Sequence, residues 1–203
     1  SGAIIVCRSR KALVRLHDMM KESGGIEKHY RLLVKGDWVN DRQHVKLPLV
    51  RYLLPSGERR VRVDQVEGVP AHTIFTLLKR YGSVSYLDAE LKTGRTHQIR
   101  VHMKYIGHTL FNDERYGGHD ILKGTTFTKY KQFVQNCFAI CPRQALHAKT
   151  LGFVHPTTGE EMFFDSEIPS DMQQLIDRWR VYANTKEPVS YTHLRAHETR
   201  RHL

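Results

Sequence analysis

Apolar and polar residues alternate most clearly over residues 28–36, KHYRLLVKG, and this alternation predicts a β-strand. Successive side chains of a strand point to opposite faces, so Tyr30, Leu32 and Val34 share one face. Lys28 lies two residues before Tyr30 and belongs to the same face. The sequence therefore predicts a strand that carries a lysine and a tyrosine side by side.

Five other regions predict strands or the loops between them. Residues 3–7 are a continuous β-favouring run, and residues 37–70 are polar and rich in turn signals, which predicts short strands and loops. Residues 71–94 predict two longer strands around a tight turn, and residues 144–166 predict a late strand pair. Residues 111–133 contain several glycines and predict a loop.

Three segments have the spacing of apolar side chains that indicates an amphipathic helix. The first covers residues 10–21, with Ser9 as its N-cap. The second covers residues 96–106. The third begins at Ser170, where Ser170 and Gln173 predict a capping box. The apolar stripe of this last helix consists of Met172, Leu175, Ile176 and Trp179.

Together these elements predict an α+β fold that is mixed, with a mainly antiparallel central sheet and flanking helices. Residues 1–185 have the size of one domain. Residues 189–203 show neither a strand nor a helix period and resemble translated adapter sequence, so we expect a non-native or disordered tail over residues 186–203. No apolar run approaches the roughly 20 residues of a membrane span, which predicts no membrane partner.

The 203 residues carry a formal net charge of +11. A positive surface field favours polyanionic partners, above all nucleic acid, although a basic face can also be simply solvated. Cys7, Cys137 and Cys141 are too few for a disulfide framework, so we expect a reducing, cytoplasmic location. Cys137, Cys141 and His147 lack a fourth ligand at zinc-site spacing, so buried free thiols are the preferred interpretation and no metal is expected.

Cationic and imidazole side chains gather most densely in residues 91–108, LKTGRTHQIRVHMKYIGH. If a strand, a glycine and a helix follow one another there, Arg95 and the first helical amides could receive an anion, because free N–H groups and the helix dipole favour negative charge. His97, Arg100 and Lys104 would share one face of that helix. An amphipathic helix with a solvated basic face explains the same pattern, and spacing alone does not separate the two interpretations.

Residues 91–108, followed by DERYGG, closely resemble the signature of RluA-type pseudouridine synthases. Three further stretches resemble the same family in the same order: the tyrosine-bearing KHYRLLVKG, the late RQALHAKTLGFVHPTTGEE, and the opening SG, which is similar to the end of a His-Arg-Leu-Asp-x-x-Thr-Ser-Gly motif. The resemblance covers residues 1–180. It implies the catalytic core of a monomeric pseudouridine synthase that acts on ribosomal or transfer RNA without a metal or organic cofactor.

The resemblance also implies roles for single residues. The reaction breaks the N1–C1′ bond of uridine and joins C5 to C1′, and the family uses an ionised aspartate that an arginine keeps charged; Arg100 matches that arginine. Tyr30 matches the active-site tyrosine whose ring packs on the flipped uracil. The residues expected to contact substrate or RNA are Lys28, Arg95, Thr96, His97, Gln98, Lys104, Arg143 and Leu146.

The catalytic aspartate of the family has no match within residues 1–203, because the His-Arg-Leu-Asp part of the motif would precede Ser1. Asp88, Glu90 and Asp113 lie near the basic segment, but none matches the family position. We therefore expect that the chain begins inside a domain and is inactive as it stands.

One other function, from a different class, remains possible from the sequence alone. A non-catalytic RNA-binding module would use the same basic surface, and the identity of the residue at the aspartate position would separate it from an enzyme. A DNA-binding domain predicts a recognition helix and dimer symmetry, which the sequence does not indicate.

Overall fold

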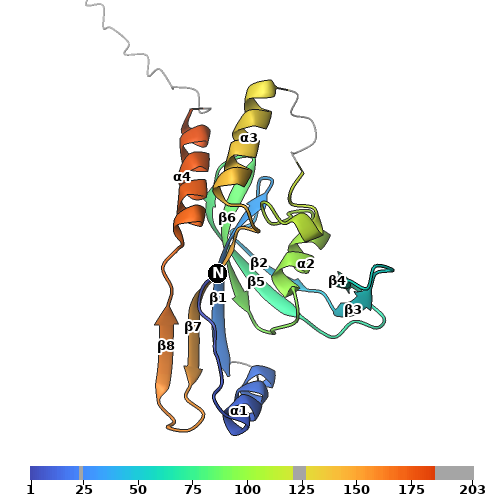
Figure 1. The fold of residues 1–203 in the computed structure, drawn as a ribbon, viewed down its shortest axis with the longest axis vertical. Coiled ribbons are helices and arrows are strands. Elements are labelled where there is room, and N and C mark those ends of the chain that lie inside the picture. Colours follow the sequence, from blue (N-terminus) through green and yellow to red (C-terminus); the bar gives the residue numbers. More distant parts are fainter. Residues whose placement is uncertain (23–24, 121–126, 186–203) are drawn as a thin grey trace, which may run out of the picture.

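The computed structural model describes residues 1–22, 25–120 and 127–185, and the predicted tail at 186–203 lies outside the described residues. Within these ranges the fold contains four α-helices and eight β-strands (Figure 1). None of the described helices has the length and the hydropathy needed to cross a membrane.

A six-stranded sheet forms the centre of the molecule, with the strand order β2-β5-β6-β1-β7-β8 (Figure 1). All pairs of neighbouring strands are antiparallel, which confirms the predicted α+β class with an antiparallel central sheet. The strand predicted from KHYRLLVKG is β1, in the middle of the sheet. The strands are β1 (Ile26–Lys35), β2 (Arg42–Lys46), β5 (His72–Arg80), β6 (Val84–Leu91), β7 (Leu146–Val154) and β8 (Glu161–Asp165).

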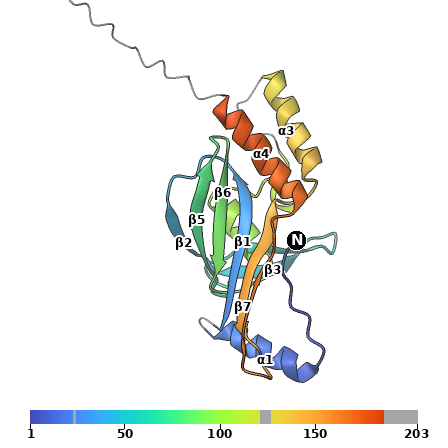
Figure 2. The ribbon, with the colours of Figure 1, turned by 90° about the vertical axis from the view of Figure 1, so that its left-hand side faces the viewer.

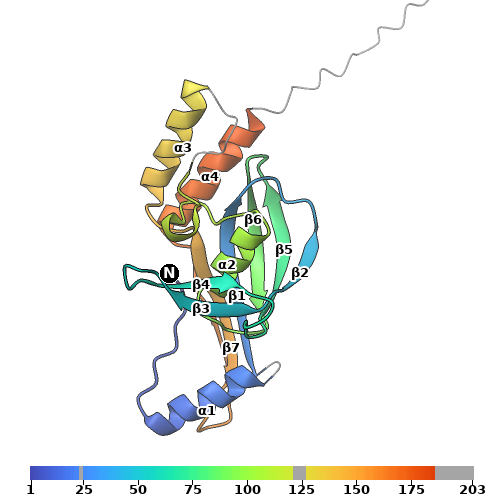
Figure 3. The ribbon, with the colours of Figure 1, turned by 90° about the vertical axis from the view of Figure 1, so that its right-hand side faces the viewer.

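One face of the sheet carries α2 and a small two-stranded sheet of β3 and β4 (Figure 3). Leu32 and Val34 of β1 are fully buried in a cluster with Ile99 and Met103 of α2. The helix thus covers the face of β1 that also carries Lys28 and Tyr30. The bounds are Gln98–Tyr105 for α2, Leu49–Leu53 for β3 and Arg59–Val63 for β4.

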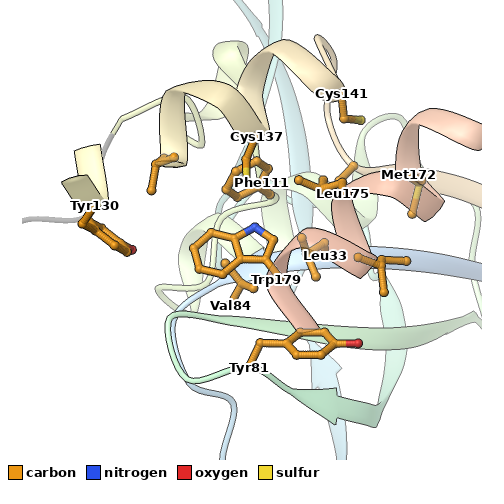
Figure 4. Packing of buried hydrophobic residues seen from close by; sticks show 13 residues of the cluster. Leu33, Tyr81, Val84, Phe111, Tyr130, Cys137, Cys141, Met172, Leu175 and Trp179 are labelled. Carbon is orange, nitrogen blue, oxygen red and sulfur yellow. The ribbon is translucent and has the colours of Figure 1, made fainter. Parts of the chain in front are cut away.

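The opposite face is covered at one end by α3 and α4, which pack against each other (Figure 2). Leu33 of β1 points to this side and is buried in the same cluster as Phe111, Leu175 and Trp179 (Figure 4). The four predicted stripe residues of the last helix are buried, as expected. The bounds are Thr128–Ile140 for α3 and Ser170–Asn184 for α4.

Residues 3–7 do not form the predicted strand. Gly2 makes an isolated parallel bridge with Ala148 at one edge of β7. From Thr150 onward, β8 pairs with this same edge. The following residues therefore meet no free strand edge, and Ile4 and Val6 are 82% and 79% exposed. The inward residues of this segment still pack against α1 (Arg10–Lys21). Ser9 caps α1 as predicted, with its hydroxyl accepting from the Ala12 amide at 3.2 Å.

Two predictions about helices were also wrong. The loop predicted at 111–133 runs into α3, whose buried Tyr130, Val134 and Cys137 recur at helical spacing. The predicted capping box does not form, because Pro169 is the N-cap of α4 and the Ser170 hydroxyl accepts from the Gln174 side chain. The sequence of α3 therefore contains the spacing of a helix, but the glycines that precede it led to the prediction of a loop.

Candidate active site

Arg100 of α2 and Asp113 form a buried ion pair. The Nε and Nη2 atoms of Arg100 donate to the two carboxylate oxygens of Asp113, each at 2.7 Å. The Arg100 side chain is 12% exposed and that of Asp113 is 1% exposed. Asp113 also accepts from the Tyr116 amide as the N-cap of the 3-10 helix Glu114–Tyr116. The pair therefore ties α2 to the turn that follows it.

The guanidinium of Arg100 has a second edge that Asp113 does not use. Arginine carries five N–H donors in a planar fork, and the pair with Asp113 engages Nε and one N–H of Nη2. Arg100 also lines a cavity of about 760 Å³. The remaining Nη1 and Nη2 donors can thus hold a second carboxylate or a phosphate.

Tyr116 gathers three of the predicted residues around its ring. The Arg100 guanidinium lies 4.8 Å from the ring centroid and the Lys104 ammonium 5.9 Å, within reach of cation–π attraction. His97 Nδ1 lies 2.8 Å from the Tyr116 hydroxyl. His97 is the N-cap of α2 in a left-handed conformation, so it precedes the helix, contrary to the predicted start at residue 96. Burial and the Arg100 charge lower the pKa of the His97 imidazole.

Tyr30 and Lys28 lie on β1, on the face that α2 covers. The cross-strand neighbours of Tyr30 are Ala89 of β6 and Ala148 of β7, so small side chains flank its ring on both sides. Tyr30 packs against the cluster that includes Ile99, which precedes Arg100 on the helix. Burial raises the pKa of the Tyr30 hydroxyl, which therefore stays protonated at neutral pH.

Lys28 reaches the loop that leads into α2. A methyl group at Gly94 would lie 2.8 Å from the Lys28 Nζ atom, so the ammonium comes close to the backbone of this loop. Burial lowers the pKa of the Lys28 ammonium. The structure thus brings Lys28 and the start of the basic segment together.

Gln98 has a different environment from the one expected for an RNA-binding residue. Its side chain is buried, with Oε1 accepting from the Arg95 amide at 3.0 Å and the Thr93 hydroxyl at 2.7 Å. Its Nε2 donates to the His72 carbonyl and the Thr73 hydroxyl. Gln98 thus holds the loop before α2 in place and occupies the backbone amide of Arg95.

Arg95 and Thr96 lie apart from the large cavity. They line a separate cavity of about 290 Å³ next to β3. Arg51 of β3 donates to the Thr96 hydroxyl at 2.6 Å, and Arg95 Nε donates to the Pro70 carbonyl at 3.3 Å. These contacts connect the basic segment to the β3–β4 hairpin.

Arg143 lines the large cavity but is mostly engaged within the protein. Its Nε and Nη2 atoms bind the Asp171 carboxylate at 2.8 and 2.9 Å, and Nη1 donates to the carbonyls of Gln144 and Leu146. This side chain ties the start of β7 to α4. The geometry therefore favours the structural interpretation of Arg143, and Leu146 packs with the cluster under α2.

The other two carboxylates near the basic segment face away from Arg100. Asp88 and Glu90 alternate along β6 with Leu87, Ala89 and Leu91, which belong to the cluster under α2. Asp88 pairs instead with Arg31 and with His29 on the other face of the sheet. Among the described residues, Asp113 is thus the carboxylate that pairs with Arg100, and both of its oxygens are occupied.

Cys137 and Cys141 are buried free thiols, as predicted. His147 is held by the Ser1 hydroxyl at 3.0 Å and the Ser166 carbonyl at 3.2 Å, the hydrogen-bonded role expected of a structural histidine. Within the described ranges, no three His, Cys, Asp or Glu side chains gather closely enough to hold a metal ion.

The two buried thiols are expected to react slowly with a thiol reagent in the folded protein. Burial raises the pKa of the Cys137 thiol to about 12 and that of Cys141 to about 11, and thiolate is the reactive form. At pH 8, dithionitrobenzoate should modify Cys7 rapidly, and all three thiols only after unfolding in urea. The Cys7→Ser variant is the control and should lose the rapid phase. A second rapid equivalent in the folded protein would contradict this prediction.

Sequence reasoning missed several residues that line or build this site. Tyr116 and Asp113 fall in the quoted DERYGG, but nothing in their spacing indicated that they would enclose Arg100. Asn112, His119 and Phe138 line the large cavity and carried no recognised signal.

Comparison with known proteins adds to this geometry. A family model described as RNA pseudouridylate synthase matches residues 1–105. Ribosomal large subunit pseudouridine synthase C of Escherichia coli strain K12 is 37% identical over 180 residues, which is 89% of this chain and 53% of that protein. The protein of the same name from Haemophilus ducreyi is 36% identical over 180 residues, with 89% and 52% covered. The chain thus spans about half the length of the curated relatives it matches.

Two solved structures share the fold. Human RNA Pseudouridylate Synthase Domain Containing 4 matches with a TM-score of 0.63 and 16% identity over 85% of this chain and 69% of that chain. Human RNA Pseudouridylate Synthase Domain Containing 1 matches with a TM-score of 0.57 and 22% identity over 85% and 73%. At these identities the likeness shows the architecture of the sheet and helices.

Proposed function

The chain belongs to the RNA pseudouridylate synthases of the RluA type, and from that premise we propose that it contributes the catalytic core of an enzyme that converts uridine to pseudouridine in ribosomal RNA. Ribosomal RNA is preferred over transfer RNA because the bacterial relatives are named for the large ribosomal subunit. A ribosomal substrate also fits the cytoplasmic location expected from the cysteines.

The observation that carries this proposal is the fixed guanidinium of Arg100. Asp113 and the Tyr116 ring hold it in one orientation, two of its N–H groups are engaged by Asp113, and Arg100 lines the large cavity. A carboxylate placed on its remaining donors would stay ionised, because a partnered arginine favours the charged form. Such a carboxylate is what the isomerisation needs as its nucleophile or base.

Tyr30 would act through its ring and its neutral hydroxyl. The alanines on both sides leave its ring accessible to a flipped uracil, which stacks on aromatic side chains. Because burial raises the pKa of the hydroxyl, Tyr30 would donate a hydrogen bond at neutral pH rather than act as a phenolate base. Lys28 would support the pocket from the same strand face.

The basic residues divide into those that would contact RNA and those that hold the site together. Lys104 and Arg95 would contact phosphates, as in the predicted RNA surface, with Thr96 beside Arg95. His97 would position Arg100 indirectly through the Tyr116 hydroxyl. Gln98 and Arg143 are assigned to structure, because their polar groups are engaged within the protein.

A tritium-release assay on ribosomal RNA labelled at C5 of uridine tests the function. We expect turnover when the chain is preceded by the His-Arg-Leu-Asp-x-x-Thr segment that its opening SG resembles, and none from residues 1–203 alone. In the active form, Arg100→Lys should lower the rate at least about 100-fold, because lysine cannot hold two carboxylates in a planar fork and small displacements are costly.

Arg180→Lys is the matched control. Arg180 belongs to an exposed pair with Asp177, so this variant should keep the parental rate. An Arg100→Lys rate within tenfold of the parent would contradict the proposed role of Arg100. Turnover by residues 1–203 alone would place the nucleophile inside them. RNA binding without turnover in either form would support the alternative of a non-catalytic binding module. That alternative is favoured by Asp113, because both of its carboxylate oxygens are engaged by Arg100 and are not free to act as a nucleophile.

A further inference from the structure

The wall of the large cavity holds a second group of side chains that the proposed isomerisation does not use. Asn112, His119 and Phe138 line it together with Arg100. Its volume of about 760 Å³ is in the range of roughly 300–1,000 Å³ in which proteins hold ligands of several rings. Tyr30, on which the flipped uracil would stack, does not line this cavity, so the space next to Arg100 is left for a neighbouring base.

His119 and Phe138 form a stacked pair in this wall. Their ring centroids lie 5.0 Å apart with the planes inclined by 22°, and Phe138 in turn packs against the buried Phe111 at 4.9 Å. His119 itself is exposed. The exposed imidazole therefore stacks on a phenyl ring that is itself packed on Phe111, and flat rings of this kind are surfaces on which nucleobases stack.

Asn112 determines which nitrogen of His119 carries the proton. The Asn112 Nδ2 atom donates to the Cys141 carbonyl at 2.7 Å and the Phe138 carbonyl at 3.3 Å, which directs Oδ1 toward His119 Nδ1 at 2.7 Å. Because an amide oxygen only accepts, Nδ1 donates, and the neutral imidazole presents Nε2 as a hydrogen-bond acceptor.

We propose that His119 and Phe138 form a subsite for an amino-bearing purine base next to the target uridine. The base would stack on His119, and its exocyclic amino group would donate to Nε2. A purine offers the larger stacking surface, and the amino group supplies the donor that Nε2 requires. Arg115, in the same wall, pairs with Glu58 through Nε at 2.9 Å, and its Nη donors remain for the phosphate of that nucleotide. This subsite rests on the proposed function, because it presupposes an RNA substrate.

Binding of small stem–loop RNAs tests the subsite. Each RNA carries one loop uridine, with adenosine, guanosine, unsubstituted purine riboside or an abasic residue at its 5′ or 3′ neighbour. Fluorescence anisotropy at constant salt gives the Kd. At one of the two neighbouring positions, we expect an RNA with adenosine or guanosine to bind at least about fivefold more tightly than the RNA with an abasic residue. This is the size of effect that loss of base stacking produces. Purine riboside, which lacks the amino group, should fall between them.

Two variants of His119 separate stacking from hydrogen bonding, and a third variant is their control. His119→Phe keeps a stacking ring but loses the acceptor, so it should bind the amino purine and purine riboside equally and both better than the abasic RNA. His119→Ala should lose all preference while binding the abasic RNA as the parent does. His17→Ala is the matched control, because His17 is exposed on α1, at the opposite end of the molecule from α3 (Figure 1).

Failure of the subsite and failure of the proposed function give different results. Binding of the RNAs without a purine preference, or with the same preference in His119→Ala as in the parent, would overturn the subsite and leave the function standing. No binding of any RNA would overturn the proposed function and the subsite with it.

Discussion

Replacing Asp113 by alanine is expected to lower the free energy of unfolding by about 3 kcal/mol, the lower end of the range of about 3–5 kcal/mol for breaking a buried ion pair. The change leaves the Arg100 guanidinium without its carboxylate at a site that is 12% exposed, and it removes the acceptor that caps the Glu114–Tyr116 turn. Urea unfolding followed by circular dichroism measures the effect as a lower midpoint at an unchanged slope.

Asp177→Ala is the matched control for this experiment. Asp177 also pairs with an arginine, Arg180 at 2.9 Å, but the two side chains are 43% and 60% exposed. Exposed pairs contribute only about 0–1 kcal/mol, so this variant should unfold close to the parental midpoint. Equal losses for the two variants would show that Arg100 finds another partner or water when Asp113 is removed.

Replacing Trp179 by alanine is expected to cost about 3–5 kcal/mol of stability, the usual range for emptying a buried aromatic site. Trp179 is 1% exposed and lies beside Phe111 (Figure 4), with 5.9 Å between the ring centroids. The ring centroids of Phe133 and Tyr182 lie 4.9 and 5.6 Å from that of Trp179. It joins α4 to α3 and to the sheet, so its loss should separate both helices from the core. The same urea titration measures this loss of stability.

Trp179→Phe should lose much less, below about 1.5 kcal/mol. The indole Nε1 is buried and finds no acceptor among the residues that the structure describes, and an unpaired buried donor costs about 1–3 kcal/mol. Phenylalanine removes this donor while retaining most of the aromatic contact. A loss as large as that of Trp179→Ala would show that ring volume, and not the unpaired donor, dominates at this position.

The elements predicted correctly are those whose pattern is local. The alternation in β1 and the stripe in α4 both follow from burial of one face, and the structure buries Leu32 and Trp179 as expected. Residues 3–7 have the composition of a strand, but a strand also needs a free edge beside it, and β8 already occupies the edge of β7. Pairing of that kind depends on distant parts of the chain and leaves no local signal.

The family resemblance named the residues of the candidate site, but the sequence did not describe how the fold encloses them. The family resemblance singled out Arg100 and Tyr30, and the structure gives both of them buried surroundings beside α2. The enclosure of Arg100 depends on Asp113 and Tyr116, which reach it through a loop and a 3-10 turn that no periodicity describes. Glutamine and arginine are common among RNA-binding side chains, so the sequence alone does not separate Gln98 and Arg143 from them. Their hydrogen-bond partners within the protein favour a structural role.

The strand order has a consequence for the order in which the site is assembled during synthesis. β1 pairs on one side with β6, which ends at Leu91, and on the other with β7, which begins only at Leu146. Nascent chains emerge from their amino-terminal end, so β1 keeps an open edge until the last strands leave the ribosome. Unpaired edges are templates for wrong pairing between chains. The central position that encloses Lys28 and Tyr30 in the finished protein thus leaves one edge of their strand unpaired while residues 36–145 are synthesised.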